Sequence, residues 1–532
     1  MADRAKVLIK EKIADSGVDL LSKNYDVDLG MDWSAEDLDA RIGDYDALLV
    51  RSATQVTADL IEKATNLKVI GRAGIGVDNI DIKAATKRGI VVANAPESNI
   101  VAAAEHTIAL MLSLCRNIPQ AHGSLVAGRW DRSKYGGIEV REKTLGIIGF
   151  GRIGQLVAAR AKAFDMEILA FDPFIGADRF RDLGVEMAES SDDLYARADI
   201  ITIHLPNTPD TANWLNAEAF AKMKDGARII NCARGELVDH DALLAALESG
   251  KLAGAALDVF PSEPITEHPL FERNDVVVTP HLGASTIEAQ DRAGTITAEQ
   301  IDAALSGGMV SNAVNVPQIR SEDREVLEPF IPLCTRLGRL AVSLSDASSI
   351  DGIEIQLLGR LADIDARLLT TAVLMGVLQG HTEEEINFVN APSLAEERGI
   401  KVSQTKDSSS EDFTELVTVS VVSGEKRVSV AGTGLGPRNL PRLISVFGQS
   451  FNLDFADHFA FFRYRNQPGM IGRVGSIFGA HGVNIDSAAV GAGGEDADEA
   501  VMAVTLLGPV PPEVIEEIVQ SDGFIDGRTV TF

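Results

Sequence analysis

The chain has 532 residues, 45% of them hydrophobic and 24% charged, so it can build several domains and is neither disordered nor fibrous. Asp and Glu number 78 against 49 Lys and Arg, and the net charge of −29 argues against nucleic acid or an anionic membrane as a partner. The three cysteines are too few and too scattered for a disulfide framework or a zinc site. The sequence shows no signal peptide and no run of roughly 18 uncharged apolar residues. We therefore expect a cytoplasmic protein of several domains, without a metal.

Short β-rich apolar segments alternate with helix-length stretches from the N-terminus to about residue 284. A first series of strands is predicted at residues 7–9, 47–50, 68–70 and 90–92. A long apolar helix is predicted next, followed by a second series of strands at 145–148, 167–171, 200–204, 228–231, 253–259 and 276–279. This alternation is typical of βαβ units in parallel sheets, so two α/β domains are expected.

Beyond residue 284 the pattern changes. A helix is predicted at 285–305, where Ser306, Gly307 and Gly308 end it. Residues 318–452 mix amphipathic helix with strand, and include a polar stretch at 405–412 that we expect to be a solvated loop. Residues 458–532 follow the order βαββαβ, which is that of a ferredoxin-like domain.

A glycine-rich segment, LGIIGFGRIG at residues 145–154, follows an apolar strand and precedes a helix predicted at 155–164. A G-x-G-x-x-G pattern alone is weak, and an ordinary tight turn is the alternative. In this context, however, Gly149, Gly151 and Gly154 place free backbone N–H groups and a positive helix end where a pyrophosphate binds. The segment therefore predicts a dinucleotide site.

Asp172 ends the next predicted strand, 18 residues after Gly154. A carboxylate there can accept hydrogen bonds from the ribose hydroxyls and repel a 2′-phosphate. The alternative is that Asp172 only forms a turn before Pro173. Together with the glycine loop, it predicts NAD rather than NADP as the cofactor.

Three further segments each place a reactive side chain just past a predicted strand, at the sheet edge where doubly wound folds bind ligands. Their residues are Arg234, Glu263 and His281. Singly, these have simple alternatives: a surface ion pair, a solvated loop and a structural histidine. Together they supply a cation for a carboxylate, a base that titrates near neutrality and a carboxylate to orient that base. Oxidation of a 2-hydroxy acid requires this combination.

The strings GFGRIG, NCARGELVD, ALDVFPSEP and TPHLGAST resemble the signatures of the D-isomer-specific 2-hydroxyacid dehydrogenases. The whole chain resembles the long members of that family, which oxidise 3-phosphoglycerate with NAD on the route to L-serine. The resemblance implies an α/β fold with a Rossmann-type NAD domain inserted into a flavodoxin-like substrate domain. An α+β intervening domain and a ferredoxin-like ACT domain would follow. The implied boundaries are 1–98 with 285–317 (substrate), 99–284 (NAD), 318–452 (intervening) and 453–532 (ACT).

The resemblance also implies roles for matching positions. His281 would be the acid/base, Glu263 would favour its imidazolium form, and Arg234 would hold the substrate carboxylate and polarise the C2 oxygen. Dinucleotide contacts are implied for Gly149, Gly151, Arg152, Ile153, Gly154 and Asp172. The nicotinamide side is implied to be lined by Cys232, Ala233, Arg234, Asp258, His281, Gly283 and Ala284.

Two arginines follow successive strands of the first lobe, Arg51 in VRSAT and Arg72 in GRAG. Guanidinium groups suit phosphate oxygens, and the resemblance implies that both arginines bind the substrate phosphate. The alternative is surface salt bridging in an acidic protein.

The C-terminal unit resembles an ACT domain, which binds amino acids where two copies pair. Asn466, before a Pro-Gly turn, and Asn484, after the following helix, are candidate ligands of an L-serine effector. Helix capping and an ordinary loop position are equally supported alternatives. For the segment FVNAP at 388–392 a scaffold and an effector site both stay open. The resemblance implies a homotetramer.

Two competing functions remain at this point. The first keeps the fold and the three catalytic residues but acts on glycerate, glyoxylate or another small 2-hydroxy acid. Arg51, Arg72 and the two additional domains argue against it. The second is a dinucleotide-sensing binding protein like the corepressors of this fold, and the ACT-like unit argues against that one.

Overall fold

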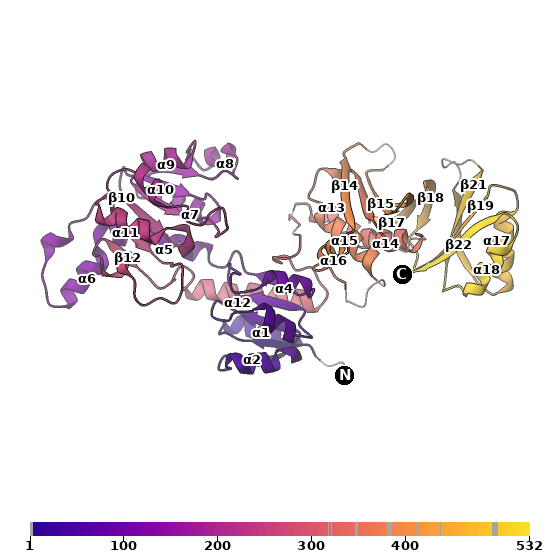
Figure 1. Ribbon diagram of the computed structural model, residues 1–532, viewed down its shortest axis with the longest axis horizontal. Coiled ribbons are helices and arrows are strands. Elements are labelled where there is room, and N and C mark those ends of the chain that lie inside the picture. Colours follow the sequence, from indigo (N-terminus) through magenta and orange to yellow (C-terminus); the bar gives the residue numbers. More distant parts are fainter. Residues whose placement is uncertain are drawn as a thin grey trace.

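Four β-sheets organise the chain, and Figure 1 shows the first of them lying between the second and the third. The computed structural model describes residues 4–317, 319–320, 322–345, 349–379, 386–409, 413–436, 438–491 and 498–532. Among these residues, no helix is both long enough and apolar enough to cross a membrane. Short 3-10 helices occur at η1 (Ile42–Asp44), η2 (Arg132–Tyr135), η3 (Gly235–Leu237), η4 (Pro269–Glu272) and η5 (Arg360–Ala362).

The first sheet is parallel and has five strands in the order β2-β1-β3-β4-β5, which is the flavodoxin-like order. Its central strands are buried because helices cover both faces. The strands are β1 (Lys6–Ile9), β2 (Asp26–Leu29), β3 (Ala47–Val50), β4 (Val69–Arg72) and β5 (Val91–Asn94). Its helices are α1 (Asp15–Asn24), α2 (Ala35–Arg41), α3 (Ala58–Lys63) and α4 (Ile82–Lys87).

The second sheet is parallel and has seven strands in the order β12-β11-β10-β9-β6-β7-β8. The strand order reverses between β6 and β9, which is the switch point of a Rossmann sheet. The strands are β6 (Thr144–Ile148), β7 (Glu167–Phe171), β8 (Glu186–Met187), β9 (Ile200–Ile203), β10 (Ala227–Asn231), β11 (Leu252–Leu257) and β12 (Val276–Val278). The helices are α5 (Ile100–Arg116), α6 (Ile118–Val126), α7 (Arg152–Lys162), α8 (Ala177–Asp182), α9 (Ser191–Arg197), α10 (Ala217–Lys222) and α11 (His240–Glu248).

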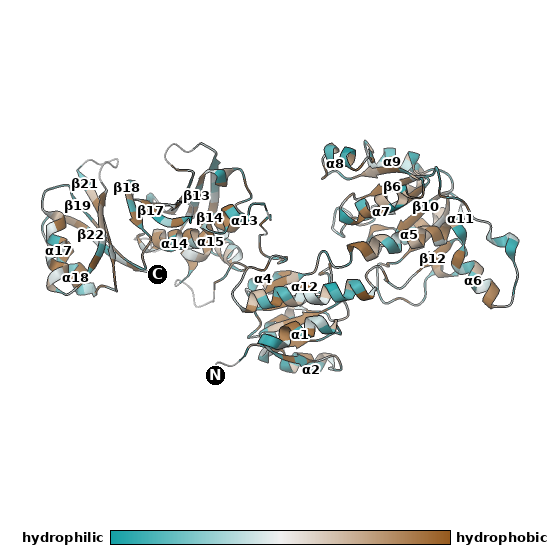
Figure 2. Cartoon of the chain, turned by 180° about the vertical axis from the view of Figure 1, so that it is seen from behind, coloured by the Kyte–Doolittle hydropathy of each residue, from teal (hydrophilic) through white to brown (hydrophobic). Residues whose placement is uncertain are grey.

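Helix α12 (Ile287–Leu305) returns the chain from the second sheet to the first. Thr286 caps it by accepting a hydrogen bond from the Ala289 N–H. The helix packs on α1 and on the strands of the first sheet, where Ile301 is fully buried. In Figure 2 the strands of both parallel sheets are predominantly apolar, whereas exposed helices such as α2 and α8 are largely polar.

A mixed sheet of six strands follows, in the order β14-β13-β15-β16-β17-β18. Its face is covered by α14, α15 and α16, which pack through apolar residues. The strands are β13 (Gly352–Gly359), β14 (Lys401–Asp407), β15 (Glu415–Ser423), β16 (Lys426–Leu435), β17 (Leu440–Val446) and β18 (Gln449–Asp454). The helices are α13 (Arg324–Leu327), α14 (Phe330–Ser343), α15 (Arg367–Leu378) and α16 (Ala391–Glu397).

The last sheet is antiparallel, in the order β20-β21-β19-β22, with α17 and α18 on one face. Phe459 and Phe461 of β19 point away from those helices and join the apolar core of the preceding sheet. The two C-terminal units therefore share one core. The elements are β19 (His458–Arg465), α17 (Met470–Ala480), β20 (Ile485–Gly491), β21 (Glu499–Leu506), α18 (Pro512–Gln520) and β22 (Phe524–Thr531).

The predicted fold class is confirmed, with local differences. Strands β2 and β8 were not predicted, because both are short and largely exposed at a sheet edge. The loop expected at 405–412 is wrong in its first part: β14 continues to Asp407 as an exposed edge strand whose polar side chains suit that position. Residues 410–412 lie outside the described part of the chain.

Candidate active site

The glycine loop joins β6 to α7 at the switch point of the second sheet. Gly149 has φ +88°, and a Cβ there would lie 2.7 Å from the His204 carbonyl oxygen, so the position requires glycine. A Cβ on Gly151 would enter open space, whereas one on Gly154 would collide with the Gly149 carbonyl. Helix α7 begins at Arg152 rather than at residue 155 as predicted, which puts Gly154 in its first turn. The loop thus fits a pyrophosphate against the helix N-terminus.

Asp172 lies just past β7 and is buried. Its Oδ2 accepts a hydrogen bond from the Phe150 N–H and its Oδ1 accepts one from the Phe174 N–H, both at 2.9 Å. The carboxylate therefore holds the glycine loop and the turn after β7 together. Each carboxylate oxygen has capacity for a second hydrogen bond, so a ribose fits here as well.

Arg152 and Ile153, the other implied dinucleotide contacts, point in different directions. Arg152 Nη1 pairs with Glu97 Oε1 at 2.9 Å, and Glu97 precedes helix α5. Ile153 packs against the apolar core of the second sheet. Glu97 was not identified from the sequence, where an acidic residue in a loop carries no signal.

His281 and Glu263 meet at the ends of neighbouring strands. His281 Nδ1 lies 2.5 Å from Glu263 Oε2, and Glu263 Oε1 accepts a hydrogen bond from the Phe260 N–H at 2.9 Å. The backbone of His281 has φ +54°, and its N–H donates to the Asp258 carbonyl at 2.8 Å. In the described part of the chain no group pairs with His281 Nε2, and the side chain is 47% exposed. Nε2 is therefore available to a substrate.

The carboxyl of Glu263 has a pKa below its ordinary value. Burial works to raise this pKa, but the hydrogen bonds from His281 and from the Phe260 N–H outweigh burial. Glu263 is thus ionised at neutral pH, and its Oε2 fixes the orientation of the His281 ring.

Asp258 orders the loop that carries His281. It is fully buried, and it accepts hydrogen bonds from Thr279 Oγ1 at 2.6 Å, Leu282 N–H at 2.7 Å and Gly283 N–H at 2.8 Å. His106 Nε2 from α5 lies 3.1 Å from the same carboxylate. Although burial works to raise the pKa of Asp258, these hydrogen bonds outweigh it and lower the pKa below its ordinary value. His106 was not identified from the sequence, because it lies within an apolar helix.

The remaining positions implied for the nicotinamide side are Cys232, Ala233, Gly283 and Ala284. Burial raises the pKa of the Cys232 thiol to about 12, so it stays protonated. The Ala233 N–H donates to Asn231 Oδ1 at 3.0 Å, and Ala284 is half-buried. Gly283 leaves room for Asp258, whose Oδ2 would lie 3.2 Å from a Cβ.

Arg234 reaches from the second lobe to the first. Its Nη1 donates to the Ala233 carbonyl at 2.7 Å, and its Nε lies 3.4 Å from Asp78 Oδ2 on the loop after β4. Its Nη2 lies over Gly76, where a Cβ would collide with it. A Cβ on Gly235 would likewise collide with the Phe260 backbone, so the loop that carries Arg234 touches the loop that carries Glu263. Gly76 and Asp78 were not identified from the sequence.

Arg72 lies within electrostatic reach of both Arg234 and Arg51. Burial and the charge of Arg234 lower the pKa of Arg72 to about 10, and Arg51 contributes to the shift. Among the described residues, Arg72 Nε is a buried nitrogen without a hydrogen-bond partner. Glu11 opposes this charge and accepts hydrogen bonds from the Arg51, Ala53 and Thr54 N–H groups at 2.9–3.1 Å. The structure thus places Arg72 within electrostatic reach of the other two predicted arginines.

Asn466 and Asn484 are both exposed, far along the chain in the last domain. The Asn466 N–H donates to the Asp498 carbonyl at 2.8 Å. Helix α17 is preceded by Gly469 with φ +92°, so the helix-capping alternative for Asn466 is wrong.

Comparisons with known proteins agree with this architecture. Residues 108–283 match the D-isomer specific 2-hydroxyacid dehydrogenase NAD binding domain, 326–447 the D-3-phosphoglycerate dehydrogenase intervening domain and 458–523 the ACT domain. The chain is 42% identical to a D-3-phosphoglycerate dehydrogenase of Archaeoglobus fulgidus, with 99% of both chains covered. It is 44% identical to one of Mycobacterium leprae, with 97% of both covered.

Solved structures resemble the N-terminal part of the chain. The TT0316 protein from Thermus thermophilus has a TM-score of 0.54 at 32% identity, and the match covers 58% of this chain and 99% of that one. A glyoxylate reductase from Paecilomyes thermophila has a TM-score of 0.54 at 31% identity, covering 59% and 99%. The chain therefore belongs to the D-isomer specific 2-hydroxyacid dehydrogenases, is an NAD-dependent oxidoreductase, and shares the full domain order of the family's D-3-phosphoglycerate dehydrogenases.

Proposed function

We propose that the chain oxidises 3-phospho-D-glycerate to 3-phosphooxypyruvate with NAD, as the first step of phosphorylated L-serine biosynthesis. The observation that carries the proposal is that Arg72 lies within electrostatic reach of Arg51 and Arg234, while the loop of Arg234 touches the loop of the His281–Glu263 pair. A substrate with a carboxylate at one end and a phosphate at the other supplies anions for these arginines. The relatives that match along their whole length are named for this activity.

The proton of the substrate hydroxyl goes to His281 Nε2. Nδ1 is held by Glu263 at 2.5 Å, which fixes the ring, and the ionised carboxylate stabilises the imidazolium that forms. Bound NAD supplies the acceptor for the hydride that leaves C2. Arg234 holds the substrate carboxylate and polarises the C2 oxygen, and Asp78 keeps its guanidinium in the cleft.

Arg72 and Arg51 bind the phosphate. Arg72 presents a buried nitrogen without a partner among the described residues, and a phosphate oxygen satisfies it. This distinguishes 3-phosphoglycerate from glycerate or glyoxylate, which leave the arginine charge uncompensated.

The proposed division of labour follows the predicted domains: substrate binding by 1–98 with 285–317, NAD binding by 99–284, an intervening domain at 318–452 and an ACT domain at 453–532. The packing of α12 on the first sheet supports the two-part substrate domain. L-serine is the proposed effector. Because Asn466 and Asn484 are exposed, a second ACT domain must complete that site.

A homotetramer in the cytoplasm is the proposed state. The hairpin of α6 and η2 projects from the second lobe (Figure 1) and exposes apolar side chains, as a subunit contact would need. They include Leu125, Val126 and Trp130, the last of which is 81% exposed.

Glu263→Gln should move the acid limb of the kcat/KM profile for 3-phosphoglycerate oxidation to lower pH. The wild-type carboxylate is ionised and favours the imidazolium, whereas a neutral amide favours it less, so His281 stays an unprotonated base in more acidic solution. The profile is measured by NADH formation between pH 5 and 9. Glu267→Gln, an exposed change in the same loop, is the control. If the acid limb of the profile does not move in Glu263→Gln, the proposed role of the His281–Glu263 pair is contradicted.

Asp172→Asn should raise the ratio of NADP to NAD kcat/KM by about tenfold or more, because the repulsion of a 2′-phosphate is removed while an acceptor oxygen remains. Asp182→Asn removes the same charge from an exposed site on α8 and should leave the ratio unchanged. Equal ratios in both variants would mean that Asp172 only orders the loop through Phe150 and Phe174.

Arg72→Gln tests the substrate. We expect KM for 3-phosphoglycerate to rise about tenfold or more, while kcat/KM for D-glycerate changes little, because only the phosphate loses its charged donor. Initial rates are measured with 3-phosphoglycerate and with D-glycerate. His281→Ala, which lacks the proposed acid/base, gives the residual rate for comparison. Wild-type turnover of glycerate with none of 3-phosphoglycerate would support the alternative substrate.

Asn484→Ala should weaken L-serine binding and relieve inhibition without changing the uninhibited kcat, because the residue lies in the last domain, outside the catalytic lobes. Calorimetry measures serine binding, and assays with and without serine measure coupling. Gln520→Ala removes an exposed amide at the end of α18 as a control. If serine gives neither heat nor inhibition with the wild-type chain, serine is not the effector.

A further inference from the structure

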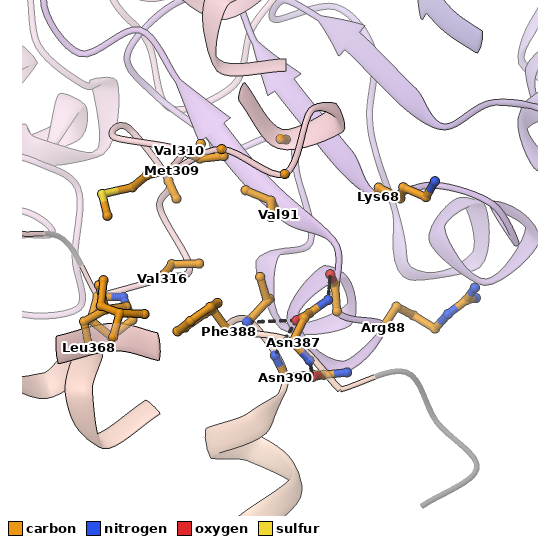
Figure 3. Close-up of a pocket in the computed structure, with 18 of the residues that line it drawn as sticks. Lys68, Arg88, Val91, Met309, Val310, Val316, Leu368, Asn387, Phe388 and Asn390 are labelled. Carbon is orange, nitrogen blue, oxygen red and sulfur yellow. Dashed lines mark hydrogen bonds between the residues drawn. The ribbon is translucent and has the colours of Figure 1, made fainter. Parts of the chain in front are cut away.

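A large cavity lies at the joint between the first lobe and the intervening domain, remote from the arginines of the active site. Its volume is about 1270 Å³, more than the roughly 300–1,000 Å³ of most small-molecule sites. One wall comes from the α4–β5 region and the segment 307–316, and the other from α14, α15 and the segment 387–390. Figure 3 shows these walls facing each other across the cavity.

The two ends of the cavity differ in chemistry. Apolar side chains gather at one end, where Met309, Val316 and Leu368 are drawn on one side of Figure 3, with Phe388 next to them. The side chains of Lys68 and Arg88 lie at the opposite end. A ligand that fills the whole cavity must therefore have an apolar body and a polar head.

The charges of the lining favour an anionic head. Four cationic residues (Lys68, Lys87, Arg88 and Arg324) face three acidic ones (Asp46, Glu328 and Glu397) in a chain whose acids otherwise exceed its bases. Lys68 pairs with Asp46 at 3.1 Å and Lys87 with Glu397 at 3.9 Å.

Arg88 and Arg324 differ from the two lysines. Within the described ranges, neither has a carboxylate oxygen within 4 Å. Arg88 Nη1 donates to the carbonyls of Ile61 and Glu62, and Arg324 Nη2 contacts the Met309 sulfur at 3.4 Å. Both guanidinium groups keep donors for an anion.

A hydrogen-bonded latch holds the two walls together beside the cavity. Asn387 Nδ2 donates to the Gly89 carbonyl at 2.8 Å, across the joint. Asn387 Oδ1 also accepts a hydrogen bond from the Val389 N–H at 2.9 Å, which orders the start of the FVNAP segment. Gly89 has φ +69°, and a Cβ there would lie 2.8 Å from Asn387 Nδ2, so the latch requires glycine.

We propose that this cavity binds an amphipathic organic anion, whose charged head meets Arg88 and whose apolar body packs against Leu368 and Phe388. It is an effector site separate from both the active site and the ACT domain. Because the ligand contacts both walls, it stabilises the arrangement of the joint in which the latch is made.

The probe for the test is 8-anilinonaphthalene-1-sulfonate, an apolar dye with one anionic group that fluoresces when it leaves water. It is titrated into the full-length protein with saturating NAD, which blocks the dinucleotide site. We expect saturable fluorescence with one dye per chain. Octanoate should displace the dye, and octanol, which has the same chain without the charge, should displace it far less well. If NAD abolishes all dye binding, the proposal fails.

Variants locate the dye. Val310→Trp adds bulk to the cavity wall and should remove the NAD-resistant signal. Arg88→Gln changes an exposed side chain, is expected to fold, and should weaken binding about tenfold or more. Arg324→Gln, beside Met309 at the apolar end, and Lys83→Gln, on α4 outside the cavity, are the controls and should leave binding nearly unchanged. Wild-type affinity in Arg88→Gln overturns the assignment.

Discussion

The burial of the Arg72 guanidinium beside two other arginines constrains the space between the two catalytic lobes. Arg72 has its pKa lowered to about 10 by burial and by Arg234, yet it stays charged at neutral pH. A buried charge next to like charges is costly without anions. The protein supplies only partial compensation through Glu11 and Asp78. The substrate has to supply the rest, and this makes the charge of the substrate part of the site.

The same constraint explains how the lobes are coupled. Arg234 belongs to the second lobe, while Asp78 and Gly76 belong to the first, so one side chain spans the cleft. Arg152 and Glu97 make a second bridge near the glycine loop. Both bridges involve groups that a substrate carboxylate or a pyrophosphate would also attract. Under the proposed function, ligand binding exchanges these contacts between lobes for contacts with the ligand, which ties occupancy to the relative position of the lobes.

Much of this could be predicted from the sequence, because parallel strands are continuous apolar runs and their carboxyl ends meet at one edge. That rule alone places Arg234, Glu263 and His281 in one region of the fold. Residues that act through other residues could not be found in this way. Glu11 holds three backbone N–H groups and His106 contacts a buried carboxylate, and neither role leaves a pattern in a single sequence. Edge strands β2 and β8 and the end of β14 were missed for a different reason, since short or exposed edge strands lack a continuous apolar run.

The C-terminal half adds a mechanical argument. Phe459 and Phe461 of the ACT-like sheet lie in the same core as the helices of the intervening domain, and Gln449 bonds to the backbone of Val501 across the boundary at 2.8 Å. Removing such large side chains from a core costs about 3–5 kcal/mol each, so the shared core resists separation of the two units. The joint that Asn387 and Gly89 close is a direct contact within one chain between the C-terminal half and the first lobe. The joint is held by polar contacts beside a cavity rather than by a packed core, so it is the place where the two halves can change their arrangement at least cost.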